Sequence, residues 1–184
     1  MMFVALASLC VAVHCGATEF DPAHTRIGFT LKTRWGQVLK GRFPRYEGRI
    51  EVLADGRYRA RLRLDARAVE IENHPKYTGL VRGDGFFEAE RFPEAEFVSD
   101  AYGGELLRAG GKLGGELRIR DVRRRETFRV EPAVCERPAL DCDVVASGVV
   151  RRSDYGVDRW MFAVSDVVRF QLRLRRREDG GTAP

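Results

Sequence analysis

The sequence predicts an all-β fold of short antiparallel strands with one or two short helices, closed either as a sandwich or as a barrel of about eight strands. Three observations predict this class. Apolar and polar side chains alternate with a period of two over many short segments, as in half-buried strands. Few windows have a helical period. Residue pairs typical of tight turns separate the segments, namely Asp55-Gly56, Gly103-Gly104, Gly110-Gly111 and Gly114-Gly115.

The first strands are predicted at residues 26–32 (RIGFTLK), 48–52 (GRIEV) and 58–65 (YRARLRLD). In the third of these, leucine and alanine occupy one face and three arginines the other. The stretch LADGRY between the second and the third is typical of a hairpin turn.

Later strands follow the same rule, and two windows are exceptions. The later strands are predicted at residues 96–99 (EFVS), 115–120 (GELRIR), 127–130 (TFRV), 144–150 (VVASGVV) and 168–175 (VRFQLRLR). Short helices are predicted instead at residues 33–41 (TRWGQVLKG) and 75–83 (PKYTGLVRG), where apolar residues recur at helical spacing.

Residues 83–97 (GDGFFEAERFPEAEF) hold four phenylalanines among four glutamates. The rings cannot all lie on one face of a single strand, so we predict a turn-rich segment that crosses the sheet and enters a strand after Pro93. The rings then face an apolar interior, and the glutamates Glu88, Glu90, Glu94 and Glu96 stay in water. Two interpretations remain open, an aromatic plug in a filled core and the wall of a ligand cavity.

Residues 1–17 are predicted to be a secretory signal peptide. They carry no Asp, Glu, Lys or Arg and are too short to span a bilayer as a helix. Cys15 and Ala17 occupy the positions before a plausible cleavage site. The alternative is a buried N-terminal strand or helix. Cleavage after Ala17 gives one barrel domain at 18–176 and a polar tail at 177–184, in a periplasmic or secreted protein.

The cysteines become informative if the chain is exported. Cys10 and Cys15 leave with the leader, whereas Cys135 and Cys142 close a short loop that contains Pro138. This pairing in an oxidising compartment predicts a disulfide, while a reducing cytosol would leave free thiols. No histidine lies near them in the sequence, which argues against a metal site.

No motif predicts catalysis, a metal or a cofactor. The chain has no Gly-x-Ser-x-Gly elbow, P-loop or Cys-x-x-Cys, and His24 and His74 lie on different segments. The net charge of +5 and the pI near 9.3 are compatible with nucleic acid. Because the arginines alternate along strands, we interpret them as a solvated outer face. Basic residues near a barrel mouth would favour an anionic head group or an anionic membrane surface.

Four segments in order resemble the YceI-like family, lipocalin-like barrels that bind polyisoprenoids. They are FDPAHTRIGFTLKTRWGQVLKGRFPRYEGRI (20–50), GDGFFEAERFPEAEFVSD (83–100), GELRIRDVRRRETFRV (115–130) and GVVRRSDYGVDRW (148–160). The resemblance extends over nearly the whole mature chain. One departure stands out, because Tyr77 and Thr78 occupy the positions where many members carry an Arg-Asp pair.

The resemblance implies a single lipocalin-like barrel that holds an isoprenoid-tailed amphiphile, such as a polyprenyl phosphate or an isoprenoid quinone, in an apolar tunnel. Each buried methylene of such a tail gains about 0.8 kcal/mol. The predicted cavity wall comprises Phe29, Leu31, Trp35, Phe43, Phe86, Phe87, Phe92, Phe97 and Trp160. The two tryptophans are included because rings near strand ends can close a barrel mouth. Arg82 and Arg152 are predicted on the head-group side, since arginine pairs with phosphate.

The expected protein is therefore a carrier of an isoprenoid lipid, without enzymatic activity. We expect a monomer or homodimer with transient contact to a membrane surface and no nucleic-acid partner. Two alternatives remain open, an enzyme that acts on a lipid and a structural or interaction barrel that holds no ligand.

Overall fold

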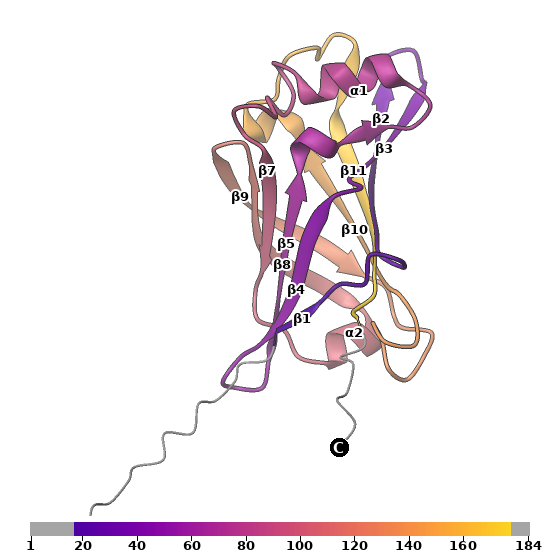
Figure 1. Cartoon of the computed structure of the whole chain (residues 1–184), viewed down its shortest axis with the longest axis vertical. Helices are drawn as coiled ribbons and strands as arrows, with labels where there is room; N and C mark the ends of the chain where they lie inside the picture. Colours follow the sequence, from indigo (N-terminus) through magenta and orange to yellow (C-terminus); the bar gives the residue numbers. More distant parts are fainter. Residues whose placement is uncertain (1–16, 178–184) are drawn as a thin grey trace, which may run out of the picture.

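The computed structural model describes residues 17–177, which form one antiparallel sheet curled into a half-barrel (Figure 1). The predicted all-β class with two short α-helices is confirmed. The leader at 1–17 and the tail at 177–184 lie outside the described residues except for Ala17 and Arg177, so both stay predictions.

The sheet has eleven strands in the spatial order β1-β4-β5-β7-β8-β9-β10-β11-β2-β3-β6. Their bounds are β1 Ala17–Glu19, β2 Arg26–Thr33, β3 Val38–Arg42, β4 Tyr46–Val52, β5 Tyr58–Asp65, β6 Glu70–Ile71, β7 Glu94–Ser99, β8 Gly111–Ile119, β9 Val122–Val130, β10 Val144–Arg151 and β11 Val164–Leu174. The strands β1, β3 and β6 have three, five and two residues. The sheet thus has more strands than the eight or so expected, because it includes these three short ones.

The two windows with a helical period have different outcomes. The prediction at 75–83 is confirmed by α1 (Pro75–Arg82), which has its proline in the first turn. The prediction at 33–41 is wrong, because a tight turn there leads into β3. Gly36 has a φ of +83°, and the Thr33 N–H donates to the Gln37 carbonyl at 2.8 Å. This left-handed glycine closes a hairpin and cannot continue a helix.

Three further helical turns join the strands. The helix α2 (Glu105–Ala109) lies at the end of the barrel opposite α1 (Figure 1). The 3-10 turn η1 (Ala66–Ala68) follows β5, and the 3-10 turn η2 (Arg152–Tyr155) follows β10. Because α1 and η2 come from distant parts of the sequence, the sheet brings two loops together at one end.

The strand β1 links β4 to the end of β11. Glu19 pairs with Arg49 on β4, and the Arg177 N–H donates to the Glu19 carbonyl at 2.8 Å. The next residue, Phe20, bridges Arg176. One short strand and the residue after it thus connect β4 with the chain just after β11, two elements that are not neighbours in the sheet order, and help to close the barrel at this end.

Four buried or half-buried phenylalanine rings lie directly over glycines of a neighbouring strand. A Cβ added at these glycines would lie 1.9 Å, 2.1 Å, 2.5 Å and 2.6 Å from the nearest ring carbon. The pairs are Phe20 with Gly48, Phe29 with Gly41, Phe97 with Gly115, and Phe128 with Gly148. Because glycine has no side chain, each ring packs against the backbone of the wall.

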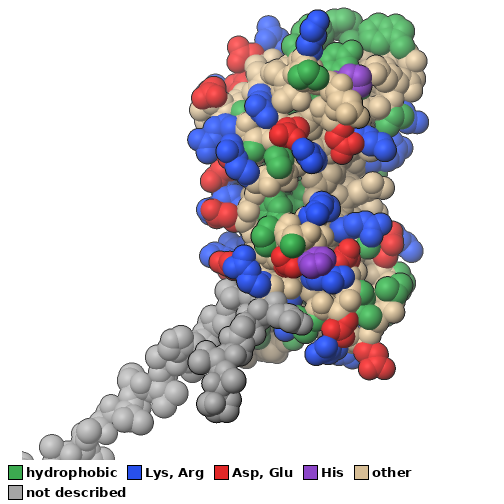
Figure 2. Space-filling model, turned by 45° about the vertical axis from the view of Figure 1, so that its right-hand side comes forward, with side chains coloured by type: hydrophobic (Ala, Val, Ile, Leu, Met, Phe, Trp, Pro, Cys, Tyr) green, Lys and Arg blue, Asp and Glu red, His purple; other side chains and the backbone are tan. Residues whose placement is uncertain are grey.

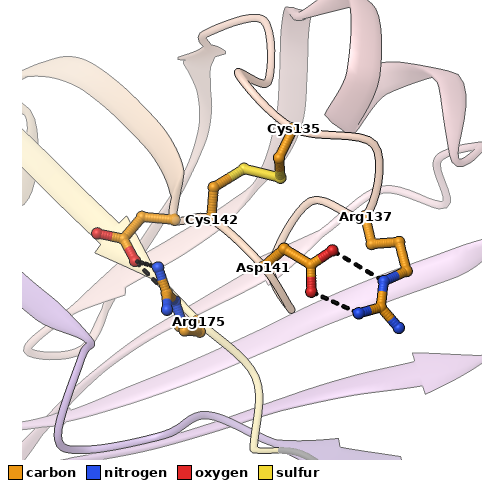
Figure 3. The surroundings of a disulfide bond; sticks show 6 residues. Cys135, Arg137, Asp141, Cys142 and Arg175 are labelled. Atoms are coloured by element: carbon orange, nitrogen blue, oxygen red, sulfur yellow. Dashed lines mark hydrogen bonds and ion pairs between the residues drawn. A yellow bond between two sulfur atoms is a disulfide. The ribbon is translucent and has the colours of Figure 1, made fainter.

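The predicted disulfide between Cys135 and Cys142 is confirmed, with an S–S distance of 2.06 Å (Figure 3). It closes a short loop between β9 and β10. Inside the loop, Arg137 Nη2 donates to Asp141 Oδ1 at 2.7 Å. The Arg175 Nε donates to Oδ1 of Asp143 at 2.9 Å and so ties the end of the loop to β11.

Replacing Cys135 and Cys142 together by serine is expected to lower the free energy of unfolding by about 2–3 kcal/mol, because the cross-link restricts the unfolded chain. Urea denaturation of the parent and the variant measures the difference. Reduction of the parent protein should give the same shift. A change below about 0.5 kcal/mol, the size of an ordinary surface substitution, would contradict this expectation.

Candidate functional site

A small apolar cavity lies inside the curled sheet at the α1 end. Its volume is about 50 Å³. The walls come from β2, the end of β8, β10, β11, α1, the loop after α1, and the η2 segment. The lining residues are Phe29, Leu31, Val81, Phe86, Phe87, Ile119, Val150, Arg152, Tyr155, Val157, Val168 and Phe170. Except for Arg152 and the hydroxyl of Tyr155, these side chains carry no polar group, so the cavity suits an apolar guest.

Five of the residues predicted for the site line this cavity, namely Phe29, Leu31, Phe86, Phe87 and Arg152. Phe29 and Leu31 share the inner face of β2, as the period of two predicts. Phe86 and Phe87 belong to the loop that follows α1. Strands and loop therefore supply opposite walls.

Two further predicted rings lie behind or beside this set. Phe43 is buried and packs against Phe29 and Phe87, with ring centroids 5.6 Å and 5.7 Å apart. Phe97 packs edge-on against Phe128 at 4.9 Å, away from the lining residues. Both rings support the core, and only Phe43 contacts rings that line the cavity.

Three predicted wall residues lie outside the cavity. Trp35 is 80% exposed at the tip of the β2–β3 turn, and Trp160 is 41% exposed in the loop before β11. Phe92 packs against two arginines, with guanidinium carbons 4.8 Å and 5.5 Å from its ring centroid. The tryptophans do not close the mouth as expected, because tight turns point both rings outward.

Arg152 is buried, and its guanidinium makes four hydrogen bonds to backbone carbonyls. Its Nε donates to the Ser165 carbonyl at 3.0 Å, and Nη1 donates to the carbonyls of Val157 and Arg159 at 3.1 Å and 3.2 Å. Its Nη2 donates to the Val164 carbonyl at 3.2 Å. The guanidinium thus holds the η2 segment against the start of β11.

Burial lowers the pKa of the Arg152 guanidinium, while the carboxylates of Asp166 and Asp158 act in the opposite direction. The cation also lies over the Phe86 ring, 5.2 Å from its centroid. The other arginine predicted for a head group, Arg82, donates from Nε to the Val69 carbonyl at 2.9 Å. Both arginines therefore have backbone partners within the fold.

Tyr155 is almost fully buried beside the cavity, and its hydroxyl donates to Glu126 Oε1 at 2.9 Å. Burial raises the pKa of the Tyr155 hydroxyl, and the hydrogen bond to Glu126 raises it further. The phenol stays neutral at physiological pH and satisfies its polar atom away from the apolar guest space.

A lid formed by α1 and residues 83–93 covers the cavity. Glu88, predicted to lie in water, is only 20% exposed on its side chain and pairs with Arg120. Arg120 also donates from Nη1 to the Gly156 carbonyl at 2.9 Å. Glu88 has a φ of +47°, a conformation uncommon outside glycine. One ion pair therefore joins the lid to the turn after β8 and the end of η2.

The positions that depart from the family pattern also lie on the lid. The Ile71 N–H donates to Thr78 Oγ1 at 2.8 Å, which ties α1 to β6. The Tyr77 ring stacks on His74 with centroids 5.3 Å apart. These contacts hold α1 against β6 and against the residue that precedes the helix.

Sequence reasoning missed seven of the lining residues. They are Val81, Ile119, Val150, Tyr155, Val157, Val168 and Phe170. The period-two pattern of residues 168–175 and 115–120 could have identified Val168, Phe170 and Ile119, because it places them on the apolar face of their strands. Tyr155 and Val157 belong to an irregular loop whose path no local pattern predicts.

The described residues 17–177 contain neither a metal-binding cluster nor a membrane-spanning helix. No group of three or more His, Cys, Asp or Glu side chains in this range is placed to hold a metal ion. No helix of the described chain is long and apolar enough to cross a membrane. His24 Nδ1 hydrogen-bonds Asp21 Oδ2 at 2.5 Å just before β2, a local role at a strand start.

A family model described as "YceI-like domain" matches residues 19–175. Among curated proteins, a UPF0312 protein of Staphylococcus aureus strain MSSA476 is 24% identical over 145 residues, which cover 76% of this chain and 81% of that protein.

Solved structures share the fold. BcnA of Burkholderia cenocepacia superposes with a TM-score of 0.66 at 20% identity, covering 84% of this chain and 98% of that one. A polyisoprenoid binding domain from Saccharophagus degradans, implicated in plant cell wall breakdown, gives 0.62 at 15% identity, covering 88% and 97%. The YCEI protein of Campylobacter jejuni gives 0.56 at 18% identity, covering 76% and 85%. At these identities the likeness concerns the fold.

Proposed function

The chain belongs to the YceI-like domain family, and on this premise we propose that it binds an isoprenoid-tailed amphiphile inside the curled sheet. The guest is a polyprenyl phosphate or an isoprenoid quinone, and the protein acts as its carrier. The similarity to a polyisoprenoid binding domain of Saccharophagus degradans supports this ligand class.

The observation that carries the proposal is the apolar cavity, with rings from β2, β11 and the lid facing one another. Phe29 and Phe170 lie with centroids 6.0 Å apart, and Phe86 and Phe87 come from the lid. Each methylene or methyl group buried against such a wall contributes about 0.8 kcal/mol to the free energy of binding. It makes few demands on the exact pattern of the tail.

The lid has to move for a tail to enter. The cavity holds about 50 Å³, whereas small-molecule sites usually measure roughly 300–1,000 Å³. Phe87 is half-buried and belongs to the lid, so an outward movement of the lid takes the rings of Phe86 and Phe87 away from β2 and β11. The sheet itself keeps its hydrogen bonds during such a movement. Residues 83–93 have to give up the Glu88–Arg120 ion pair and the contact between Phe86 and Arg152, whereas α1 can stay bonded to Ile71 and Val69 through Thr78 and Arg82.

The polar head group remains at the mouth of the cavity in this proposal. Arg152 donates hydrogen bonds to four backbone carbonyls. It therefore stabilises the backbone at the mouth and gives the cavity a positively charged rim. A phosphate head would gain from that charge without displacing the backbone bonds.

The place of action in the proposal is the periplasm or the extracellular space. The uncharged leader at 1–17 and the Cys135–Cys142 disulfide support it, because disulfides persist in oxidising compartments. N-terminal sequencing of the exported protein should begin at Thr18, and an intact Met1 on a cytoplasmic protein would exclude this location.

Replacing Phe87 by leucine is expected to weaken binding of an added polyprenyl phosphate or isoprenoid quinone by about tenfold, because the smaller side chain loses apolar contact with the tail equivalent to roughly two methylene groups at about 0.8 kcal/mol each. Isothermal titration measures the dissociation constant. Phe128→Leu is the matched control, because its ring packs on Phe97 away from the lining residues, and its affinity should equal that of the parent. Equal affinity of Phe87→Leu and the parent, or no binding by the parent, would reject the proposal and favour a filled structural barrel.

A further inference from the structure

Exposed apolar side chains gather at the lid end of the barrel. Ten large hydrophobic side chains of the described chain are exposed, and seven lie on the β2–β3 hairpin, on α1 and on the loop before β11. Trp35 is 80% exposed, Phe162 71% and Leu80 47%. Figure 1 places the three segments at one end, and Figure 2 shows hydrophobic side chains with basic ones at this end. We call this surface the mouth patch.

The mouth patch is continuous. The rings of Trp160 and Phe162 lie 5.7 Å apart between centroids, and Leu80 lines a surface hollow together with both. The Arg34 N–H donates to the Ala163 carbonyl at 2.9 Å, which holds the hairpin with Trp35 beside the loop. Three separate segments therefore present one apolar surface.

One of the exposed rings is held in an unusual backbone conformation. Trp160 has a φ of +64°, which is a genuine outlier for a bulky residue. The N–H groups of Ala163 and Val164 both donate to the Trp160 carbonyl at 2.8 Å and fix the turn. Strain of this kind persists where the surrounding structure maintains it and clusters at functional sites.

The charge of the same segments is positive. Residues 32–40, 75–84 and 157–163 carry six basic and two acidic side chains, a net charge of 6 − 2 = +4. Arg34, Lys76 and Arg159 are exposed, and none of them forms an ion pair within 4 Å with another residue in the described part of the chain. Exposed tryptophan beside arginine and lysine is the combination that membrane interfaces favour.

We infer that the mouth patch docks on the surface of an anionic lipid bilayer. The inference deepens the proposed function and rests on it, because Val81 of α1 lines the cavity while Leu80, next to it, belongs to the patch. In the docked state the lid faces the bilayer, and an isoprenoid tail passes between membrane and cavity without crossing water. A second copy of the chain fits less well, since two patches of the same positive charge repel each other.

Co-sedimentation with vesicles tests the inference. The parent protein is expected to bind vesicles of phosphatidylglycerol and phosphatidylethanolamine, to bind phosphatidylcholine vesicles much less, and to be released as ionic strength rises. The double variant Trp35→Ser, Phe162→Ser should bind the anionic vesicles at least about tenfold more weakly, because two rings lose their apolar contact. Val134→Ser is the control, since Val134 is 90% exposed beside Ala133, which bonds the α2 residue Arg108.

The outcomes separate docking from ligand binding. Titration with a polyprenyl phosphate in solution reports the cavity alone, and Phe162→Ser should keep the affinity of the parent there. A parent protein that binds the lipid in solution but stays in the supernatant with anionic vesicles would overturn the docking inference and leave the proposed function intact. Equal vesicle binding by the double variant, or a dimer in sedimentation that the double variant abolishes, would also overturn it.

Discussion

Replacing Arg152 by methionine is expected to lower the free energy of unfolding by at least about 3 kcal/mol, because each buried acceptor left without a donor costs about 1–3 kcal/mol. Four backbone carbonyls lose their partner in this variant, and the Phe86 ring loses the cation above it. Urea denaturation followed by circular dichroism measures the loss.

The neighbouring residue provides the control for this variant. Arg151 is exposed, and its contact with Asp166 is an ion pair at 3.8 Å, so Arg151→Met should change stability by no more than about 1 kcal/mol. Arg152→Lys should remain destabilised, because one ammonium cannot replace the planar fork of donors. An unfolding midpoint of Arg152→Met equal to that of the parent would mean that the buried guanidinium does not hold the η2 segment.

Replacing Gly41 by alanine is expected to act on stability and on binding together. The added Cβ would lie 2.1 Å from a carbon of the Phe29 ring, so the ring has to leave its place over β3. Overpacking of this kind costs about 1–3 kcal/mol. Because Phe29 lines the cavity, its displaced ring occupies space meant for the ligand, and titration with a polyprenyl phosphate should show binding at least about tenfold weaker.

The same substitution at Gly79 is the control. A Cβ there meets nothing within 4 Å, and alanine is the better helix former by up to about 1 kcal/mol. Gly79→Ala should therefore be neutral or slightly stabilised. If Gly41→Ala behaves like Gly79→Ala in denaturation and in titration, the packing of the Phe29 ring on Gly41 does not shape the cavity.

Eight of the eleven strands were predicted, because burial on one face imposes a period of two, whereas the short strands β1, β3 and β6 were missed. Residues 58–65 and 168–175 alternate apolar and polar side chains without a break and correspond closely to β5 and β11. The prediction of a helix at 33–41 was wrong because a turn followed by a strand gives the same apolar spacing as a helix. The positive φ of Gly36 is compatible with the turn and not with the helix.

The site could be predicted only where its residues belong to strands or to the phenylalanine-rich segment. Phe29, Leu31, Phe86 and Phe87 were found in this way. The role of Arg152 could not be predicted. Its guanidinium binds backbone carbonyls of the loop after η2 and of the start of β11, and only the fold brings these carbonyls together.

Trp35 and Trp160 show a second reason why some cavity-wall residues were wrongly predicted. Size and apolar character made Trp35 and Trp160 reasonable choices for a cavity wall. Their orientation depends on the turn at Gly36 and on a left-handed backbone at Trp160 itself. The direction of a side chain in a tight turn follows from backbone torsions that composition does not reveal.

Native mass spectrometry of the protein purified from its host shows whether the barrel carries an isoprenoid lipid. We expect a species heavier than the bare chain by the mass of one isoprenoid lipid, removed by organic extraction and restored by incubation with a polyprenyl phosphate or an isoprenoid quinone. If only the bare mass is found, both as purified and after incubation with an excess of either lipid, the protein is not an isoprenoid carrier and the barrel has a filled core.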